Sequence, residues 1–420
     1  MPTRTTSLIL LCALFCISAS AQSTPTATLT AASPISGGAL GTSVAISGST
    51  VAAGGGGIIL VFTKPTSSPW SDMTESAQLK SAGTAIGGVL AINGDGSIII
   101  SCAPGGVQVF VKPEGGWHGV IFPTALLVQG APPKYWVLQG TLHSVAINAK
   151  GDTIVAGAFD AGSQGHPSGG KIVEGIKEQG AAYIWSEPAG GWAAANNSPQ
   201  TAKLVAGVNY DHFGWSVGVS ANTIAIGAPA NVANGTSDNG SIYLYNRPAK
   251  GVWLDATKVR SKFTTSDAAP GTYFGYSVAI ADSGALVAAS NGAGCNGTDG
   301  AAYVFARPGT SWPTGGLNQT AKLTPSDISG ADCFLPVSAA GEQITVGAFS
   351  ALNGAGAAYN FVEPQGGWGN LSLPASLIGG SGSESFGSSV SISGRTTAVG
   401  APWTTENGVS LAGAVYVFTN

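Results

Sequence analysis

Charged residues are scarce in this chain: Asp, Glu, Lys and Arg make up 9% of its 420 residues, and the net charge is −4. The 17 Lys and Arg residues are scattered, whereas a surface that binds nucleic acid needs them clustered to displace counterions. We therefore expect no nucleic-acid partner. The chain is not predicted to be disordered, because hydrophobic residues reach 44%.

Long apolar runs are also missing. The run from Leu8 to Ile17 is shorter than the roughly 20 residues that a membrane helix needs, and no later segment is long enough. It lies between Arg4 and the small-residue triplet 19–21, which is typical of a secretory signal. We predict a signal peptide over residues 1–21, a mature chain over residues 22–420, a secreted, extracellular or cell-surface location, and no transmembrane segment.

Catalytic motifs are missing too. The chain has four histidines but no HExxH, GxSxG, CxxC or phosphate-binding loop. Nucleophilic catalysis needs a nucleophile, a base and a group that orients the base, and no spacing in the sequence supplies that set. We therefore favour a protein that is not an enzyme.

What the sequence has in abundance is repetition. The stretch GAAYVFARP (300–308) has close copies, which are GAAYIWSEP (180–188), GSIYLYNRP (240–248), GAAYNFVEP (356–364) and GAVYVFTN (413–420). A second phrase precedes each of them, as in FGWSVGVSANTIAIGAP (213–229), FGYSVAIADSGALVAAS (274–290) and FGSSVSISGRTTAVGAP (386–402). Weaker relatives begin at residues 40, 86, 141 and 334, which makes seven copies.

One copy resolves into four short strands. Residues 216–219 alternate small and apolar side chains, 220–222 form a turn, and 223–226 return. Residues 242–245 form the third strand, which Pro248 ends because proline has no N–H to donate. The fourth strand is predicted to begin at Trp253 and to continue to Val259. Equivalent tryptophans recur in register, and we expect all six to pack between neighbouring units: Trp70, Trp117, Trp192, Trp253, Trp312 and Trp368.

Seven units of four antiparallel strands predict an all-β fold, a seven-bladed β-propeller. The last copy is one strand short, and the phrase TATLTA (26–31) near the N-terminus matches the missing strand. We therefore predict that the N-terminal strand completes the last blade, in a single domain that is a monomer.

The pairs Phe213-Gly214 with 227–229 and Phe386-Gly387 with 400–402 resemble the FG-GAP repeat, which builds the propeller of integrin α-subunits. The resemblance implies an extracellular propeller that binds a ligand. Propellers of that family often carry a calcium loop between strands one and two. The corresponding turns here offer at most one carboxylate each, and a hard cation needs several oxygens. We therefore expect no metal and no other cofactor.

The family's ligand-binding rim holds the loops after strand two and the segments that lead into strand one. The longest insertion here runs from Asp160 to Glu178, and the position after FG holds a large ring in three blades. Rings at that place either stack on a ligand or plug the central channel, and we favour plugging. The candidate ligand-binding residues on this rim are Asp160, His166, Tyr210, Asp211, His212, Trp215, Tyr276 and His143.

Three cysteines remain once the signal peptide is removed. Cys295 and Cys333 are placed on the same rim of neighbouring blades, and we predict a disulfide between them. Cys102 is expected to be a packed thiol.

Two functions remain open at this point. The first is adhesion or recognition, in which the rim binds an extracellular protein or a glycan. The second is an enzyme that acts on polysaccharide as a lyase, with acid and base residues on the same rim. A purely structural or surface-layer role is a third possibility.

Overall fold

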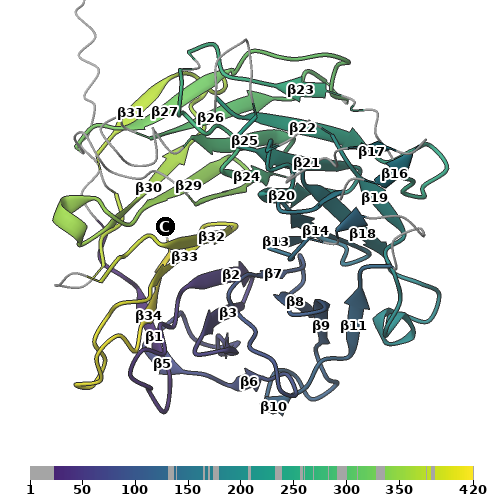
Figure 1. Cartoon of the computed structure of the whole chain (residues 1–420). Coiled ribbons are helices and arrows are strands. Elements are labelled where there is room, and N and C mark those ends of the chain that lie inside the picture. The colour runs from purple at the N-terminus through teal and green to yellow at the C-terminus, as the bar shows by residue number, and fades with distance from the viewer. Residues whose placement is uncertain are drawn as a thin grey trace, which may run out of the picture.

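The computed structural model describes residues 23–419, except 131–136, 139, 164–165, 169–170, 174–178, 207–209, 232–238, 256–258, 260, 268, 282, 291–299, 310, 328–335, 375 and 380–383. For residues 137–138, 163, 166–168, 171–173 and 353 it describes the backbone alone. Figure 1 shows small sheets arranged in a ring around an open centre.

Seven sheets of mainly antiparallel strands form the blades. Blade 1 contains β2 (Ser43–Ser47), β3 (Thr50–Gly55), β4 (Ile58–Thr63) and β6 (Ala77–Leu79), and blade 2 contains β7 (Leu90–Ile92), β8 (Ile98–Ala103), β9 (Gly106–Val111) and β11 (Ala125–Val128). Blade 3 contains β13 (Ser144–Ile147), β14 (Thr153–Ala158), β18 (Ala181–Ser186) and β19 (Ala202–Leu204). Blade 4 contains β20 (Ser216–Val219), β21 (Thr223–Ala228), β22 (Ser241–Asn246) and β23 (Ser261–Phe263).

Blade 5 contains β24 (Ser277–Ile280), β25 (Ala285–Ser290), β26 (Ala301–Ala306) and β27 (Ala321–Pro325). Blade 6 contains β28 (Val337–Ala340), β29 (Gln343–Ala348) and β30 (Ala357–Val362). Blade 7 contains β32 (Ser389–Ser393), β33 (Thr396–Ala401), β34 (Ala414–Thr419) and β1 (Ala27–Thr30). The remaining elements are β5 (Met73–Thr74), β10 (Gly119–Ile121), β12 (Val137–Leu138), β15 (Gly162–Ser163), β16 (His166–Ser168), β17 (Lys171–Val173), β31 (Leu371–Leu373) and the short 3₁₀ helices η1 (Trp192–Ala195) and η2 (Leu352–Gly354).

The N-terminal strand closes the ring, as predicted. β1 pairs antiparallel with β34, with Ala27 opposite Val417 and Leu29 opposite Val415. The two ends of the described chain thus lie in one sheet, and Figure 1 shows β1 and β34 next to each other. This pairing confirms the seven-bladed, all-β propeller.

Two details differ from the predicted blades. In blade 4 the fourth strand is β23, which begins after Val259, so the predicted strand from Trp253 to Val259 is wrong. In blade 6 three strands pair, because β31 instead joins β27 of blade 5 in parallel. β5 and β10 likewise pair in parallel with β1 and β6 of the preceding blades. Outer edges are thereby covered by the next stretch of chain, which protects them from pairing with other molecules.

The glycine of GAP in one blade packs directly against the glycine of FG in the next blade. Gly227 of blade 4 lies so close to blade 5 that an added Cβ would stand 2.0 Å from the carbonyl oxygen of Gly275. Ser216 donates a hydrogen bond to the same carbonyl at 2.8 Å. Gly400 and Ser389 of blade 7 meet Gly41 of blade 1 in the same way, at 2.0 and 2.7 Å. The repeat therefore encodes a close backbone contact between neighbouring sheets.

The hydrophobic core is divided among the blade boundaries. The described residues form seven apolar clusters, each built from two neighbouring sheets. Each of the six recurring tryptophans lies in one of these clusters and is no more than 8% exposed. In blades 2 and 3 the indole also donates to a turn carbonyl, from Trp117 to Gly96 and from Trp192 to Gly151, both at 2.9 Å. The predicted packing between units is confirmed.

Candidate functional site

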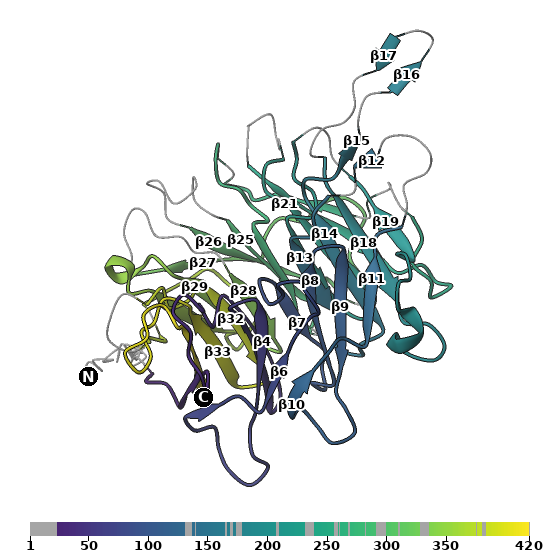
Figure 2. The ribbon, with the colours of Figure 1, turned by 60° about the horizontal axis from the view of Figure 1, so that its bottom comes forward.

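The loops after strand two and the segments that lead into strand one meet at one end of the ring, which we call the loop rim. Their contacts include parallel bridges from Gly180 to Phe213 and from Gly240 to Phe274. In Figure 2 this rim is the upper one, where β12 and β15 lie and the β16–β17 hairpin projects. The turns between strands one and two lie at the opposite end, which we call the turn rim.

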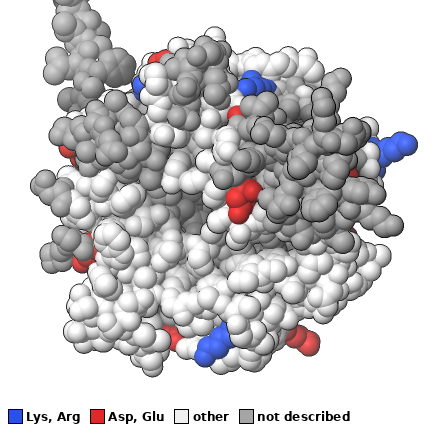
Figure 3. All heavy atoms as spheres, in the orientation of Figure 1, with Lys and Arg blue, Asp and Glu red and all other residues white. Residues whose placement is uncertain are grey.

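A cavity of about 660 Å³ opens on the loop rim between blades 1, 2 and 3. Its walls come from the β8–β9 loop, from the segment before β7 and from the segment before β13, which ends in His143. Cavities of this size hold small molecules in many proteins. Figure 3 shows that the visible face is hollowed near the ring centre and carries few charged residues.

Aromatic rings form a continuous run beside this cavity. The Phe159 ring lies 4.3 Å from His143, 5.3 Å from His212 and 4.6 Å from Trp215, measured between ring centroids. Trp215 in turn lies 5.0 Å from Tyr276 and is stacked at 5.9 Å on His212. These separations fall in the range where ring pairs attract each other. We call these five residues the aromatic run.

The run takes its position from the innermost strands. His143, Trp215 and Tyr276 directly precede β13, β20 and β24, which neighbour one another around the ring axis. The equivalent positions of the other four blades hold Thr42, Gly88, Pro336 and Ser388. Large rings are therefore restricted to three adjacent blades.

The run remains open to solvent. His143 is exposed, and Phe159, His212, Trp215 and Tyr276 are half-buried. Partial burial raises the pKa of the Tyr276 hydroxyl. The expectation that these rings mainly plug the channel stays a prediction, but their exposure leaves faces on which a ligand can stack.

A carboxylate adjoins the run. Oδ2 of Asp160 lies 3.9 Å from Nε2 of His143, and both side chains are more than a third exposed. Oδ1 of Asp160 is buried and has no hydrogen-bond partner among the described residues. A buried polar atom without a partner costs free energy, so Asp160 retains capacity to accept a hydrogen bond.

The structure therefore brings together five of the eight residues predicted from the sequence: Asp160, His143, His212, Trp215 and Tyr276. Tyr210 is 50% exposed and precedes them on the same rim. His166 lies in β16, and its side chain is outside the described residues. Phe159, the ring at the centre of the run, is not among these eight, although it opens the loop 159–178 that was expected to contact a ligand. It stands where Pro229 and Pro402 follow Gly-Ala in blades 4 and 7, but Phe349 occupies the same place in blade 6, so the replacement alone does not mark a site.

Asp211 occupies a different environment, because it is 1% exposed. The pKa of Tyr243 is held well above its usual range, mainly by burial and to a smaller extent by the negative charge of Asp211. In three other blades the tyrosine at the equivalent position donates a hydrogen bond to an acidic residue in the segment before the first strand. These pairs are Tyr303 with Asp267 at 3.2 Å, Tyr359 with Asp327 at 2.9 Å and Tyr416 with Glu384 at 3.0 Å. The structure thus places Asp211 with these recurring acids and does not bring it to the exposed surface.

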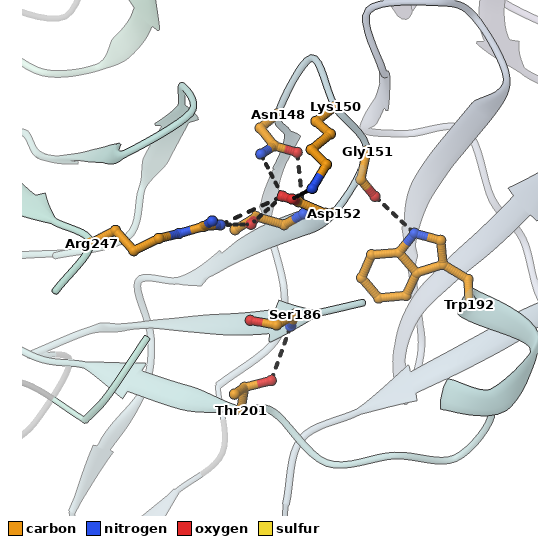
Figure 4. A network of polar contacts seen from close by, with 9 residues as sticks. Asn148, Lys150, Gly151, Asp152, Ser186, Trp192, Thr201 and Arg247 are labelled. Carbon is orange, nitrogen blue, oxygen red and sulfur yellow. Dashed lines mark hydrogen bonds and ion pairs between the residues drawn. The ribbon is translucent and has the colours of Figure 1, made fainter. Parts of the chain in front are cut away.

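The turn rim carries a separate polar network, which Figure 4 shows around Asp152. Lys150 Nζ lies 2.9 Å from Oδ2, and Asn148 donates to Oδ1 at 2.8 Å. From blade 4, Arg247 places Nη2 3.5 Å from Oδ1 and also donates to Thr153. Burial opposes ionisation of Asp152, but these donors outweigh it and lower its pKa to about 2. This aspartate is therefore held charged by two side-chain cations.

The cysteines and the acidic residues bear on two further predictions, a disulfide and a metal site. Burial raises the pKa of the Cys102 thiol to about 12, which disfavours the reactive thiolate, but the residue is half-buried and lines the cavity rather than being fully packed. Cys295 and Cys333 lie outside the described residues, and their disulfide stays a prediction. Within the described residues no three His, Cys, Asp or Glu side chains are grouped closely enough to hold a metal ion, and the expected absence of calcium stays a prediction.

The architecture defines the class of protein, a seven-bladed β-propeller whose blades are joined by glycine contacts. Three segments, residues 199–245, 258–305 and 378–418, match the family model of the FG-GAP repeat. The first two matches run from the outer strand of one blade to the third strand of the next, and the third match covers β32, β33 and most of β34 in blade 7. This seven-bladed propeller therefore contains FG-GAP repeats at three positions, and the resemblance deduced from residues 213–229 and 386–402 is confirmed.

Other comparisons yield less. The solved structure of the C-terminal WD40 domain of Sif2 is similar over 94% of this chain and 95% of that chain, with 12% sequence identity and a TM-score of 0.44. No curated protein matches the sequence. Within the part of the chain that the structure describes, no helix is both long and apolar enough to cross a membrane.

Proposed function

We propose that this chain is a secreted propeller that binds an extracellular glycan or protein at its loop rim, through the aromatic run. The observation that carries the proposal is the contact of five rings from adjacent blades in a half-exposed row next to a cavity of about 660 Å³. Flat aromatic faces beside hydrogen-bonding groups suit sugar rings and peptide side chains alike.

The distribution of aromatic rings among the blades also supports a ligand-binding role for the aromatic run. The recurring tryptophans and tyrosines are buried between blades, whereas the rings of the aromatic run occupy three blades only and remain accessible. A structural role would be expected in every blade, because every boundary has to be packed. Rings confined to one side of the mouth fit a ligand contact better.

The test is a glycan-array binding assay on the mature chain, residues 22–420, with and without a calcium chelator. A discrete set of bound glycans that Trp215→Ala abolishes supports the proposal. Loss of binding on chelation contradicts the expectation that no calcium takes part. If no glycan binds, capture of extracellular proteins with the wild type and Trp215→Ala decides whether the rim binds protein, and equal capture by both rejects the proposal.

A second candidate function rests on His143 and Asp160. Their 3.9 Å separation at the edge of the cavity suits a base and the group that orients it, as a polysaccharide lyase requires. Release of unsaturated products from a uronic-acid polymer, lost in both His143→Ala and Asp160→Asn, supports the enzyme. Binding without turnover excludes it for that polymer.

A further inference from the structure

Two neighbouring blade boundaries on the turn rim differ by one carboxylate. At the boundary of blades 3 and 4, Arg247 follows β22 and reaches back to Asp152 and Thr153, which open β14. At the boundary of blades 4 and 5, Arg307 follows β26 in the same way. The strand pairings align Thr153 with Thr223, because each lies opposite the last residue of its third strand. Asn222 therefore stands where Asp152 stands.

The exchange removes, at the position that faces Arg307, the carboxylate that Arg247 meets in the preceding boundary. Arg247 has the carboxylate of Asp152 at 3.5 Å, whereas among the described residues no acidic group lies within ion-pairing distance of Arg307, and its Nε has no hydrogen-bond partner. The side chain lies against its own blade at Gly284, where a Cβ would come within 2.8 Å of Arg307 Cζ. A guanidinium presents five donors in a plane that match an oxyanion.

A cavity of about 450 Å³ occupies this place. Arg247 and Arg307 both line it, together with Asn222, Asn246 and Ser311, and none of its lining residues is acidic. The volume exceeds what a single small ion needs and falls within the range of small-molecule sites. The amide and hydroxyl groups supply further donors and acceptors beside the two guanidinium groups.

We propose that this cavity binds an acidic sugar, whose oxyanion pairs with Arg307 in place of the absent carboxylate. The oxyanion is the carboxylate of a uronate or the sulfate ester of a sulfated sugar, and both present oxygens that a guanidinium binds in a bidentate manner. The sugar hydroxyls meet Asn222, Asn246 and Ser311. The site is at the opposite end of the ring from the aromatic run and is independent of it.

The probes are glucuronate and glucose 6-sulfate, with glucose as the neutral control, titrated into residues 22–420 by calorimetry. We expect the acidic sugars to bind and glucose not to bind. Arg307→Gln weakens this binding about tenfold or more, in keeping with the loss of a charged hydrogen-bonding pair. Lys250→Gln, an exposed cation nearby that does not line the cavity, leaves it unchanged.

Asn222→Asp is the sharper variant, because it supplies within the chain the carboxylate that the ligand is proposed to bring. This variant should lose sugar binding and gain thermal stability, so the loss cannot come from misfolding. Binding of one acidic sugar alone identifies the oxyanion and supports the site. Binding of neither, binding of glucose as well, or unchanged binding in Arg307→Gln or Asn222→Asp overturns it.

Discussion

Two aspartates flank the same strand and show how the two rims differ. Asp152 directly precedes β14 and is surrounded by Lys150, Asn148 and Arg247. Asp160 follows the strand by two residues, and among the described residues the imidazole of His143, at 3.9 Å, is its one ion-pair partner. The chain uses one carboxylate to tie blade 3 to blade 4, and leaves the other with an oxygen that has no partner in the described structure.

The two ends of β14 therefore serve different purposes: the turn-rim end stabilises the contact between blades 3 and 4, and the loop-rim end leaves groups available for a ligand. At the turn rim of blade 3, the carboxylate of Asp152 is paired from within the chain. The loop rim holds exposed rings and an incompletely paired carboxylate in one sector. Substitutions at the two ends of β14 should therefore affect different properties.

The largest loss of stability is expected from a side chain placed at the close backbone contact between two blades. In Gly227→Val, the new side chain meets the Gly275 carbonyl of blade 5, which is backbone and cannot move aside. The free energy of unfolding should fall by about 3 kcal/mol or more, and ligand binding should fall with it. Chemical denaturation measures the loss, and Gly115→Val, at an exposed glycine that has open space around the Cβ and, like Gly227, no positive φ, controls for the replacement of a glycine by valine. Equal losses in the two variants would contradict the contact between blades.

A smaller loss is expected at the turn rim. Asp152→Asn keeps the shape but removes the charge that pairs with Lys150 and Arg247, and should cost about 1–3 kcal/mol of unfolding free energy. Lys150 is largely exposed and contributes little of this, so Lys150→Gln serves as the matched control. Binding at the loop rim should be unchanged, and a loss of binding in Asp152→Asn would break the separation of the two rims.

The dependence of stability on acid pH tests the same ion pair of Asp152. The pKa of Asp152 is lowered to about 2 in the folded chain, below its ordinary value near 3.9 in an unfolded chain. Its contribution is therefore complete above about pH 4 and is lost as the pH falls from about 4 to 2. The wild type should lose stability over this interval more steeply than Asp152→Asn. Denaturation at pH 5 and pH 2.5 measures the difference, and parallel losses would contradict the ion pair.

The smallest change in stability is expected at the loop rim. Trp215 is half-buried, and Trp215→Ala should lower the melting temperature by only a few degrees, corresponding to about 1 kcal/mol. Trp253→Ala, which empties a buried site between blades, should cost about 3–5 kcal/mol. Thermal unfolding of the two variants side by side measures this. A loss in Trp215→Ala as large as in Trp253→Ala would assign the aromatic run to the core.

The sequence predicts the ring well because its signals are local and repeated. Residues 216–219 form β20 with the predicted bounds, and the missing strand of blade 7 was found by its match to other outer strands. The fourth strand of blade 4 was misplaced, since β23 is three residues long and has little pattern of its own. Asp255, which lies in the segment where the strand was predicted, accepts a hydrogen bond from the backbone N–H of Lys203 in blade 3, at 2.7 Å.

The candidate site is predictable in part for the same reason. Trp215 and Tyr276 share one position of the repeat, so alignment of the copies places them together. Phe159 occupies a loop position, and its role depends on contacts across blades that no local pattern contains. The partnership of Arg247 with the start of β14 spans 94 residues from Thr153, and only the closed ring brings the two together.

The central claim is that the aromatic run binds the ligand of this propeller. The most direct measurement is the affinity of residues 22–420 for a ligand found on the glycan array, compared among the wild type, Phe159→Ala and Asp152→Asn, with melting temperatures taken in parallel. The account predicts that Phe159→Ala loses at least tenfold in affinity while it stays folded, and that Asp152→Asn binds as the wild type does but melts earlier. Full affinity in a folded Phe159→Ala would contradict it.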